Sequence, residues 1–303
     1  MRHAFVEALS KIAAVDDRVI LLTADLGFHV LEPFAERFPS RFINVGVAEA
    51  NMMGVATGLA ARGLVPYCYS IATFASMRGY EQLRDGAALH HLPVKVVGVG
   101  AGVGYGTLGA THHAIEDVAI LRVMPGMAVV APADPRQVMK AVGLIHDLPG
   151  PAYLRLAKSA SALDELSPTI EWDSVQTIGV GSVAVATYGV VVKAALAAAR
   201  TLSAEGIETR VVVVPVLSPV PESALREAFR GCQLIITAED HRRTGGLGSM
   251  IAEILADDAA STRLVRLGYE GPFYQDHGSE DYLHGRMGID TFGIVEAFHQ
   301  AML

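Results

Sequence analysis

The sequence predicts two doubly wound α/β domains, and three features point to this fold class. Short apolar runs alternate with longer periodic segments along the chain, which is typical of parallel sheets covered by helices on both faces. The 303 residues suffice for about two domains. A polar, turn-rich stretch separates two such alternations. We therefore place a first domain at 1–160, a linker at 161–180 and a second domain at 181–303.

The first domain is predicted to begin with an amphipathic helix over residues 1–17. Two later periodic segments, Glu49–Ala61 and Pro135–His146, are long enough to serve as right-handed crossovers between parallel strands. The predicted strands of this domain are the apolar runs 19–24, 42–45, 65–69, 94–99, 127–132 and 152–156.

The second domain is predicted to begin with the strand SVAVATY, followed by the alanine-rich helix VVKAALAAARTLSAEG. Three further strands are RVVVVPV, QLIITAE and RLVRLG, separated by helices that start near Pro221 and Gly246. The pattern is again that of an α/β domain.

Composition excludes several function classes. The 24 Lys and Arg residues against 32 Asp and Glu residues give a net charge of −8 with no basic block, so we expect no nucleic-acid partner. No apolar run is long enough to span a bilayer, and the N-terminal stretch is amphipathic, so we expect a cytoplasmic protein with no membrane partner. A mean hydropathy of +0.35 indicates apolar surface that meets a partner. Cys68 and Cys232 lie apart in apolar runs and are expected to be core thiols.

The most informative segment is FPSRFINVGVAEANMMGVATGLAARG at 38–63. A strand ends at Val45, a glycine turn follows, and Glu49 begins a helix of 3.6-residue period. Gly54 and Gly58 clear one side of that helix for close approach by another backbone. Taken alone, Glu49 could merely favour the helix N-terminus.

This segment resembles the pyrimidine-binding domain of transketolases and deoxyxylulose-phosphate synthases. Further matches follow in the family's order: TADL resembles SADL, TFASMRGYEQLR an aromatic stretch beside the cofactor, GATHH the GPTHQ loop, and AEDHRRTGGLGSMIAEIL the family's EEH and GGLGSAVAEVL run. The resemblance extends from Arg2 nearly to the C-terminus and implies a thiamine diphosphate-dependent enzyme.

The resemblance also implies cofactor-binding roles. The Glu of the AE pair, Glu49, faces N1′ of the aminopyrimidine and promotes the cofactor's reactive imino form, so Glu49 is expected to be catalytic. Phe74 is expected to stack on the pyrimidine, with Tyr69 as a second stacking candidate. Asp25 matches the family's Asp beside the thiazolium, and Arg78 belongs to the same stretch as Phe74.

At the substrate end, the first histidine of the GATHH loop matches a substrate-facing residue of the family. We expect His112 to hydrogen-bond or transfer a proton to a ketose oxygen. The family's acid in this loop is replaced by Leu108, its polar residue some eight positions earlier by Gly100, and its phosphate-binding Arg by a lysine. Gly100 is expected to remove a polar contact and to leave extra room for the substrate. The expected substrate-binding residues are Arg2, His29, Leu108, His112, His113 and Lys158.

Other interpretations of these motifs are weaker. The adjacent His112 and His113 lack further ligands at metal-binding spacing, so no metal site is predicted in this chain. GVGAGVGYGTLG contains GxGxxG spacing, but no helix obviously follows it and no acid lies about 20 residues on. The chain could instead be the β subunit of a 2-oxo-acid dehydrogenase, although it lacks that family's HSQS-like loop and PGG stretch, or a non-catalytic α/β module.

The family's GDG motif, with NN some residues later, is missing, and the only asparagines are Asn44 and Asn51. In the family this motif holds the cofactor's diphosphate and Mg²⁺. The chain thus resembles the C-terminal half of a transketolase encoded as a separate subunit. We expect a partner that carries the diphosphate and Mg²⁺ ligands, a two-plus-two heterotetramer, and transfer of a two-carbon ketol unit from a non-standard sugar to an aldehyde.

Overall fold

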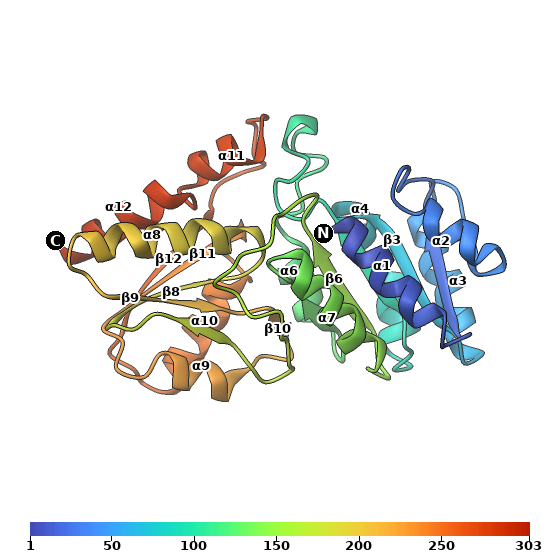
Figure 1. The fold of residues 1–303 in the computed structure, drawn as a ribbon, viewed down its shortest axis with the longest axis horizontal. Helices are drawn as coiled ribbons and strands as arrows, with labels where there is room; N and C mark the ends of the chain where they lie inside the picture. Colours follow the sequence, from blue (N-terminus) through green and yellow to red (C-terminus); the bar gives the residue numbers. More distant parts are fainter.

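The computed structural model describes all 303 residues and divides into two lobes, each built on one sheet (Figure 1). The first sheet has seven strands in the order β10-β5-β6-β4-β3-β1-β2, and the second has five in the order β12-β11-β8-β9-β7. The predicted fold class, two α/β domains, is therefore confirmed.

The first six strands run parallel, which fits their nearly continuous apolar sequences. The sequence placed all six within a few residues of their observed bounds: β1 Val19–Thr23, β2 Phe42–Asn44, β3 Val65–Ile71, β4 Lys95–Val99, β5 Ala128–Val130 and β6 Ala152–Leu156.

Helices cover both faces of this sheet. Phe5, Phe34 and Val138, from α1, α2 and α7, belong to the core of one face. Met52 and Ala75, from α3 and α4, belong to the core of the other face, together with α6. These helices are α1 Arg2–Ala13, α2 Glu32–Arg37, α3 Glu49–Ala61, α4 Ala72–Met77, α5 Tyr80–Gln82, α6 Asp117–Arg122 and α7 Pro135–His146.

The second lobe repeats this arrangement, with α8 and α12 on one face of its sheet and α9 and α10 on the other. The elements of this part of the chain, of which β10 joins the first sheet, are β7 Gln176–Ile178, β8 Val183–Thr187, α8 Val192–Ala204, β9 Thr209–Val213, β10 Val216–Ser218, α9 Glu222–Ala228, β11 Leu234–Arg242, α10 Leu247–Asp257, β12 Arg263–Tyr269, α11 Glu280–Met287 and α12 Thr291–Met302.

One predicted strand of the second domain is in fact two. RVVVVPV is divided at Pro215, which has no N–H to continue a ladder. β9 ends at Val213 in the second sheet, whereas β10 crosses to the first sheet and pairs antiparallel with β5. This exchange extends one apolar core, which includes Val129 and Leu217, across the boundary between the lobes.

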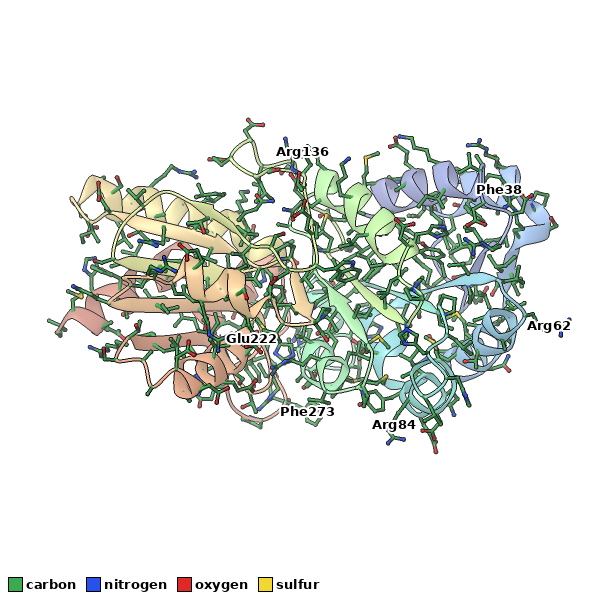
Figure 2. The ribbon with its side chains drawn as sticks, turned by 90° about the horizontal axis from the view of Figure 1, so that it is seen from below. Phe38, Arg62, Arg84, Arg136, Glu222 and Phe273 are labelled. Atoms are coloured by element: carbon green, nitrogen blue, oxygen red, sulfur yellow. The ribbon has the colours of Figure 1, made fainter.

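The segment between the lobes is also more ordered than the predicted linker at 161–180. Its last residues form β7, an antiparallel edge strand of the second sheet. Arg136, which lies between the lobes in Figure 2, donates hydrogen bonds to the carbonyls of Leu163 and Leu166. The two lobes are therefore tied by side chains as well as by the chain itself.

Two further sequence observations can be compared with the fold. Cys68 and Cys232 are both buried and unpaired, which confirms their assignment as core thiols. No helix combines the length and the hydrophobicity that crossing a membrane would require.

Candidate active site

Glu49 lies buried at the start of α3. It is the first residue of that helix, as predicted, and its side chain is only 2% exposed. Its two carboxylate oxygens have different partners: Ser70 Oγ donates to Oε1 at 3.0 Å, and Arg78 Nη1 donates to Oε2 at 2.9 Å. A carboxylate can accept about four hydrogen bonds. Glu49 is therefore held in one orientation and can still accept a further donor.

Phe74 and Arg78, both predicted cofactor contacts, lie beside Glu49. The Arg78 guanidinium sits 3.7 Å from the centroid of the half-buried Phe74 ring, while its side chain remains 46% exposed. His112 meets the same ring edge-on, with centroids 5.2 Å apart. The structure therefore joins four predicted residues into one cluster: they come from α3, from α4, from the C-cap of α4 and from the loop after β4.

Tyr105 connects the cluster to Lys158 and Arg2, two of the predicted substrate-binding residues. Its ring lies 6.4 Å from that of His112, and Lys158 Nζ lies 5.2 Å from its centroid. Arg2 Nε donates to the Lys158 carbonyl at 3.1 Å. Burial raises the pKa of Tyr105, although the nearby Arg2 acts in the opposite direction. An unbroken row of contacts thus links the buried carboxyl group to two cations.

The parallel sheet explains this convergence. Glu49, Phe74, Tyr105 and Lys158 each follow the carboxyl end of a strand, namely β2, β3, β4 and β6. In open α/β sheets the carboxyl ends of parallel strands share one edge, and ligands bind beyond that edge. Residues that are more than 100 positions apart therefore meet at one edge of the first sheet.

Asp25 and His29 lie on the loop after β1, at the same sheet edge. Asn44 fixes the first of them, because its side chain donates to Asp25 Oδ1 and accepts from the Asp25 N–H, both at 3.0 Å. His29 is exposed, and its N–H donates to Glu32. Both residues have positive φ angles, 55° and 62°, so this loop is held in a specific strained shape.

Two predicted site residues lie elsewhere. Tyr69 is 1% exposed and stacks on Phe5 in the core, with ring centroids 5.9 Å apart. It therefore offers no free ring face, and the expectation of a second stacking ring is wrong. His113 is 3% exposed and packs against Tyr274 of the second lobe. Burial lowers its pKa, and its place at the domain junction leaves it no exposed nitrogen for a substrate.

Gly100 does not open extra room in the substrate end, contrary to the sequence-based expectation. A Cβ built at this position would lie 2.1 Å from ring atoms of Tyr105, so the aromatic ring already occupies that space. Leu108 follows on the same loop with 54% of its surface exposed. Beside His112 this loop therefore presents an aromatic ring, that of Tyr105, and an exposed apolar side chain, that of Leu108.

Sequence reasoning missed three residues that shape the site: Ser70, Tyr105 and Asn44. Ser70 lies in the run VPYCYS, and the alternation of that strand could have placed it next to Glu49. Tyr105 lies in the glycine-rich loop, where the GxGxxG spacing indicates a role for the glycines and none for the tyrosine between them. No sequence signal pointed to Asn44.

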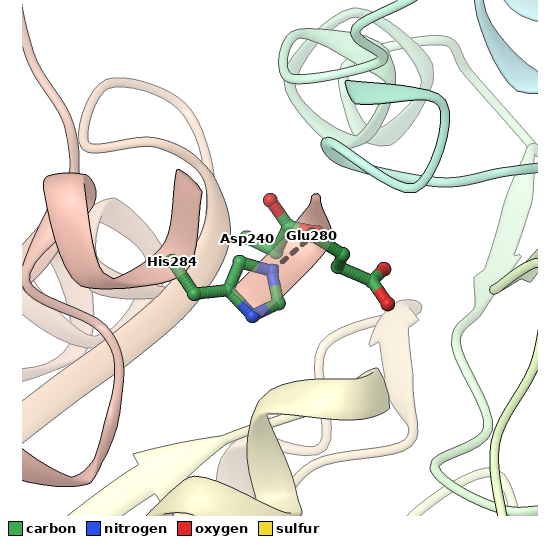
Figure 3. A group of neighbouring side chains, drawn as sticks. All are labelled: Asp240, Glu280 and His284. Atoms are coloured by element: carbon green, nitrogen blue, oxygen red, sulfur yellow. Dashed lines mark ion pairs between the residues drawn. The ribbon is translucent and has the colours of Figure 1, made fainter. Parts of the chain in front are cut away.

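The donor set fits the pyrimidine end of thiamine diphosphate: a buried carboxyl group with spare acceptor capacity and a half-exposed aromatic ring. The one group of three potential metal ligands, Asp240, Glu280 and His284, lies in the second lobe (Figure 3). His284 Nε2 there lies 3.2 Å from Asp240 Oδ2, as an ion pair. This cluster is separate from Glu49 and Phe74.

Two family models match the chain and together cover most of it. The model for the transketolase pyrimidine-binding domain matches residues 1–162. The model for the transketolase C-terminal domain matches residues 180–294.

Individual proteins of similar length match nearly the whole chain. The chain is 33% identical to an apulose-4-phosphate transketolase subunit of Phocaeicola vulgatus, over 97% of this chain and 95% of that protein. It is 37% identical to the 6-deoxy-6-sulfo-D-fructose transketolase subunit SqwH of Clostridium sp. strain MSTE9, over 99% and 94%. A solved structure described as a split gene transketolase, inactive beta4 tetramer, superposes with a TM-score of 0.90 at 34% identity, covering 99% of this chain and 97% of that one.

Proposed function

The chain belongs to the transketolase family, and on that premise we propose that it is the pyrimidine-binding subunit of a split, thiamine diphosphate-dependent transketolase. The enzyme would transfer a two-carbon ketol unit from a ketose to an aldehyde. The observation that carries this proposal is the row of contacts from buried Glu49 through Phe74 and His112 to Lys158 and Arg2.

The alternatives are less favoured. Two relatives that match over nearly the whole of both chains are transketolase subunits, which supports two-carbon ketol transfer over a 2-oxo-acid dehydrogenase. Burial of the Glu49 carboxyl group is costly, and its contacts with Ser70 and Arg78 repay that cost only in part. This favours a catalytic use of the group over a non-catalytic module.

When bound, thiamine diphosphate supplies the carbon nucleophile that adds to a ketose carbonyl. This chain's residues prepare the site. Glu49 holds a proton near N1′ of the pyrimidine, oriented by Ser70 and Arg78, and Phe74 supports the ring. His112 lies against Phe74 and can donate or accept a proton at the sugar oxygens.

We propose that a partner subunit supplies the diphosphate and Mg²⁺ ligands and closes the site. The open character of the site supports this arrangement, because Arg78 is half exposed and Phe74 half buried. On α3, a Cβ built at Gly54 or Gly58 meets nothing within 4 Å in this chain. That bare helix face is suited to a closely packed partner. We expect a two-plus-two assembly with that partner.

The stacking role of Phe74 gives one expected result. Phe74→Ala should raise the KM for thiamine diphosphate about fivefold, because one aromatic contact contributes roughly 1 kcal/mol, with a smaller effect on kcat. The measurement is cofactor titration of the reconstituted complex. Phe273→Ala, which removes a ring that is 71% exposed on the second lobe, is the matched control and should change nothing. An equal change in the KM for thiamine diphosphate in the two variants would show that Phe74 does not contact the cofactor.

At the substrate end, Arg2 and Lys158 suit a sugar with an anionic terminus, since the Lys158 ammonium lies over the Tyr105 ring and Arg2 donates to the Lys158 carbonyl. The two relatives are named for apulose 4-phosphate and 6-deoxy-6-sulfo-D-fructose, which carry such groups. Leu108 cannot accept a hydrogen bond from a sugar hydroxyl. We therefore propose a non-standard anionic sugar as the substrate.

A donor and acceptor panel tests this proposal. An unpaired hydroxyl facing Leu108 costs roughly 1–3 kcal/mol, so the xylulose 5-phosphate and ribose 5-phosphate pair should give a kcat/KM about one to two orders of magnitude below the best modified sugar. The panel on the reconstituted complex compares phosphorylated, sulfonated, deoxygenated and unphosphorylated sugars. The highest kcat/KM for the standard pair would contradict the proposal.

A further inference from the structure

The loop that bears Tyr105 and His112 is anchored by the second domain. This loop, residues 102–114, follows β4 and is closed at its base by two backbone hydrogen bonds between Gly102 and Ala114, at 3.1 and 2.7 Å. It also carries Leu108, so three residues of the proposed substrate end share one loop. The position of this loop therefore determines the direction in which the three side chains point.

Asp240 of β11 contacts this loop directly. Its carboxylate oxygens lie 3.2 and 3.1 Å from the Val103 N, which donates to them, and the residue is only 2% exposed. A Cβ built at Gly102 would lie 1.7 Å from Asp240 Oδ2. Only glycine at position 102 lets the carboxylate reach the loop backbone.

The other side of the loop base is tied to the same residue through Arg155. The buried guanidinium donates from Nη2 to the carbonyls of Ala114 and Asp240, at 3.1 and 2.9 Å. Its Nε donates to Asp117 at 2.9 Å. Asp240 therefore accepts a hydrogen bond from Val103 with its carboxylate, and its backbone carbonyl is linked to that of Ala114 by the Arg155 guanidinium.

Helix α11 and the turn before it reinforce this anchor. The Gly278 N–H donates to the Gly106 carbonyl at 3.1 Å, and Leu283 fills the space where Gly106 would carry a side chain. His284 of the same helix lies 3.2 Å from Asp240 (Figure 3). Burial would raise the pKa of Asp240, but His284, Arg155 and the Val103 N–H outweigh burial and hold it below its usual value. The anchor is thus a charge-assisted hydrogen bond.

We infer that Asp240 is a positioning residue: from the second domain, it fixes the 102–114 loop so that Tyr105 and His112 face the sugar. This inference rests on the proposed function, because that function gives the loop its substrate. It assigns to the C-terminal domain a role in substrate geometry without any contact to the cofactor.

The test uses Asp240→Ala in the reconstituted complex, with hydrogen exchange and kinetics measured together. Amide exchange should accelerate within residues 102–114, and kcat/KM for the sugar should fall about tenfold or more. The KM for thiamine diphosphate should stay within about twofold, because Glu49 and Phe74 lie on α3 and α4. Asp240→Asn, which keeps an acceptor for Val103 N–H, should recover much of the protection and activity.

Glu253→Ala is the matched control. It removes an ion pair with Arg122, at 2.8 Å, that joins the same two domains but does not touch the loop, and Glu253 is 61% exposed. This variant should behave as wild type in every readout.

Three results would overturn the inference. The first is unchanged amide exchange of residues 102–114 in Asp240→Ala. The second is a rise in the KM for thiamine diphosphate as large as the fall in kcat/KM for the sugar, and the third is a fall in kcat/KM for Glu253→Ala as large as that for Asp240→Ala. A wild-type complex without two-carbon transfer would instead count against the proposed function. Faster loop exchange in Asp240→Ala would then still support the anchor itself.

Discussion

Glu49→Gln is expected to abolish turnover of the reconstituted complex, with a loss of at least about 10²- to 10⁴-fold in kcat. The amide has nearly the same shape, so Ser70 and Arg78 keep a partner, but it cannot hold and share a proton with the pyrimidine. Arg78 is half exposed, and water can solvate it once the charge of Glu49 is gone. Assembly should therefore survive, as size-exclusion chromatography with the partner would show.

Glu81→Gln provides the control for this substitution. Glu81 lies exposed on α5 and has no place in the row of site contacts, so its variant should retain full activity. Near wild-type turnover by the Glu49→Gln complex would show that Glu49 does not activate the cofactor.

The second large effect concerns the partner. The purified chain, given thiamine diphosphate and Mg²⁺, should show no two-carbon transfer, and activity should appear only when the N-terminal-half subunit is added. The physical reason is that the row from Glu49 to Lys158 lies on an open face, where water is not excluded and the cofactor's charged end lacks ligands. Robust turnover by the chain alone would refute this expectation.

The bare face of α3 allows a sharper form of this experiment. Gly58→Leu should leave the isolated chain folded, because nothing in the chain lies within 4 Å of the added Cβ, and helix propensity should even stabilise it by about 0.5–1 kcal/mol. Thermal unfolding would measure that stability. The same variant should fail to assemble and should lack activity when the partner is present. Normal assembly would place the partner on another face.

The fold could be predicted from the sequence wherever one local pattern decided the structure. The helices Glu49–Ala61 and Pro135–His146 have the bounds that their periodicity predicted. The segment RVVVVPV was wrongly predicted as one strand. Its residues are nearly all apolar, but those before Pro215 pair in the second sheet and Val216 pairs in the first, and only long-range packing determines this division.

The site shows the same limit. Glu49, Phe74 and His112 came from motifs and lie together in the structure. The space above Gly100 could not be judged from its residue type, because Tyr105, five positions away, folds back to fill it. The prediction for Tyr69 was wrong for a related reason. A side chain in a strand can point to either face of the sheet, and that of Tyr69 points to the face whose core contains Phe5.

The most direct test of the central claim needs no knowledge of the substrate. It is the rate at which the C2 proton of thiamine diphosphate exchanges with solvent deuterium in the reconstituted complex, followed by acid quench and NMR. We predict exchange far faster than in free cofactor for the wild-type complex and for Glu81→Gln, and a return toward the rate of free cofactor for Glu49→Gln. Equal exchange in the wild-type and Glu49→Gln complexes would contradict the assignment of Glu49 as the residue that activates the cofactor.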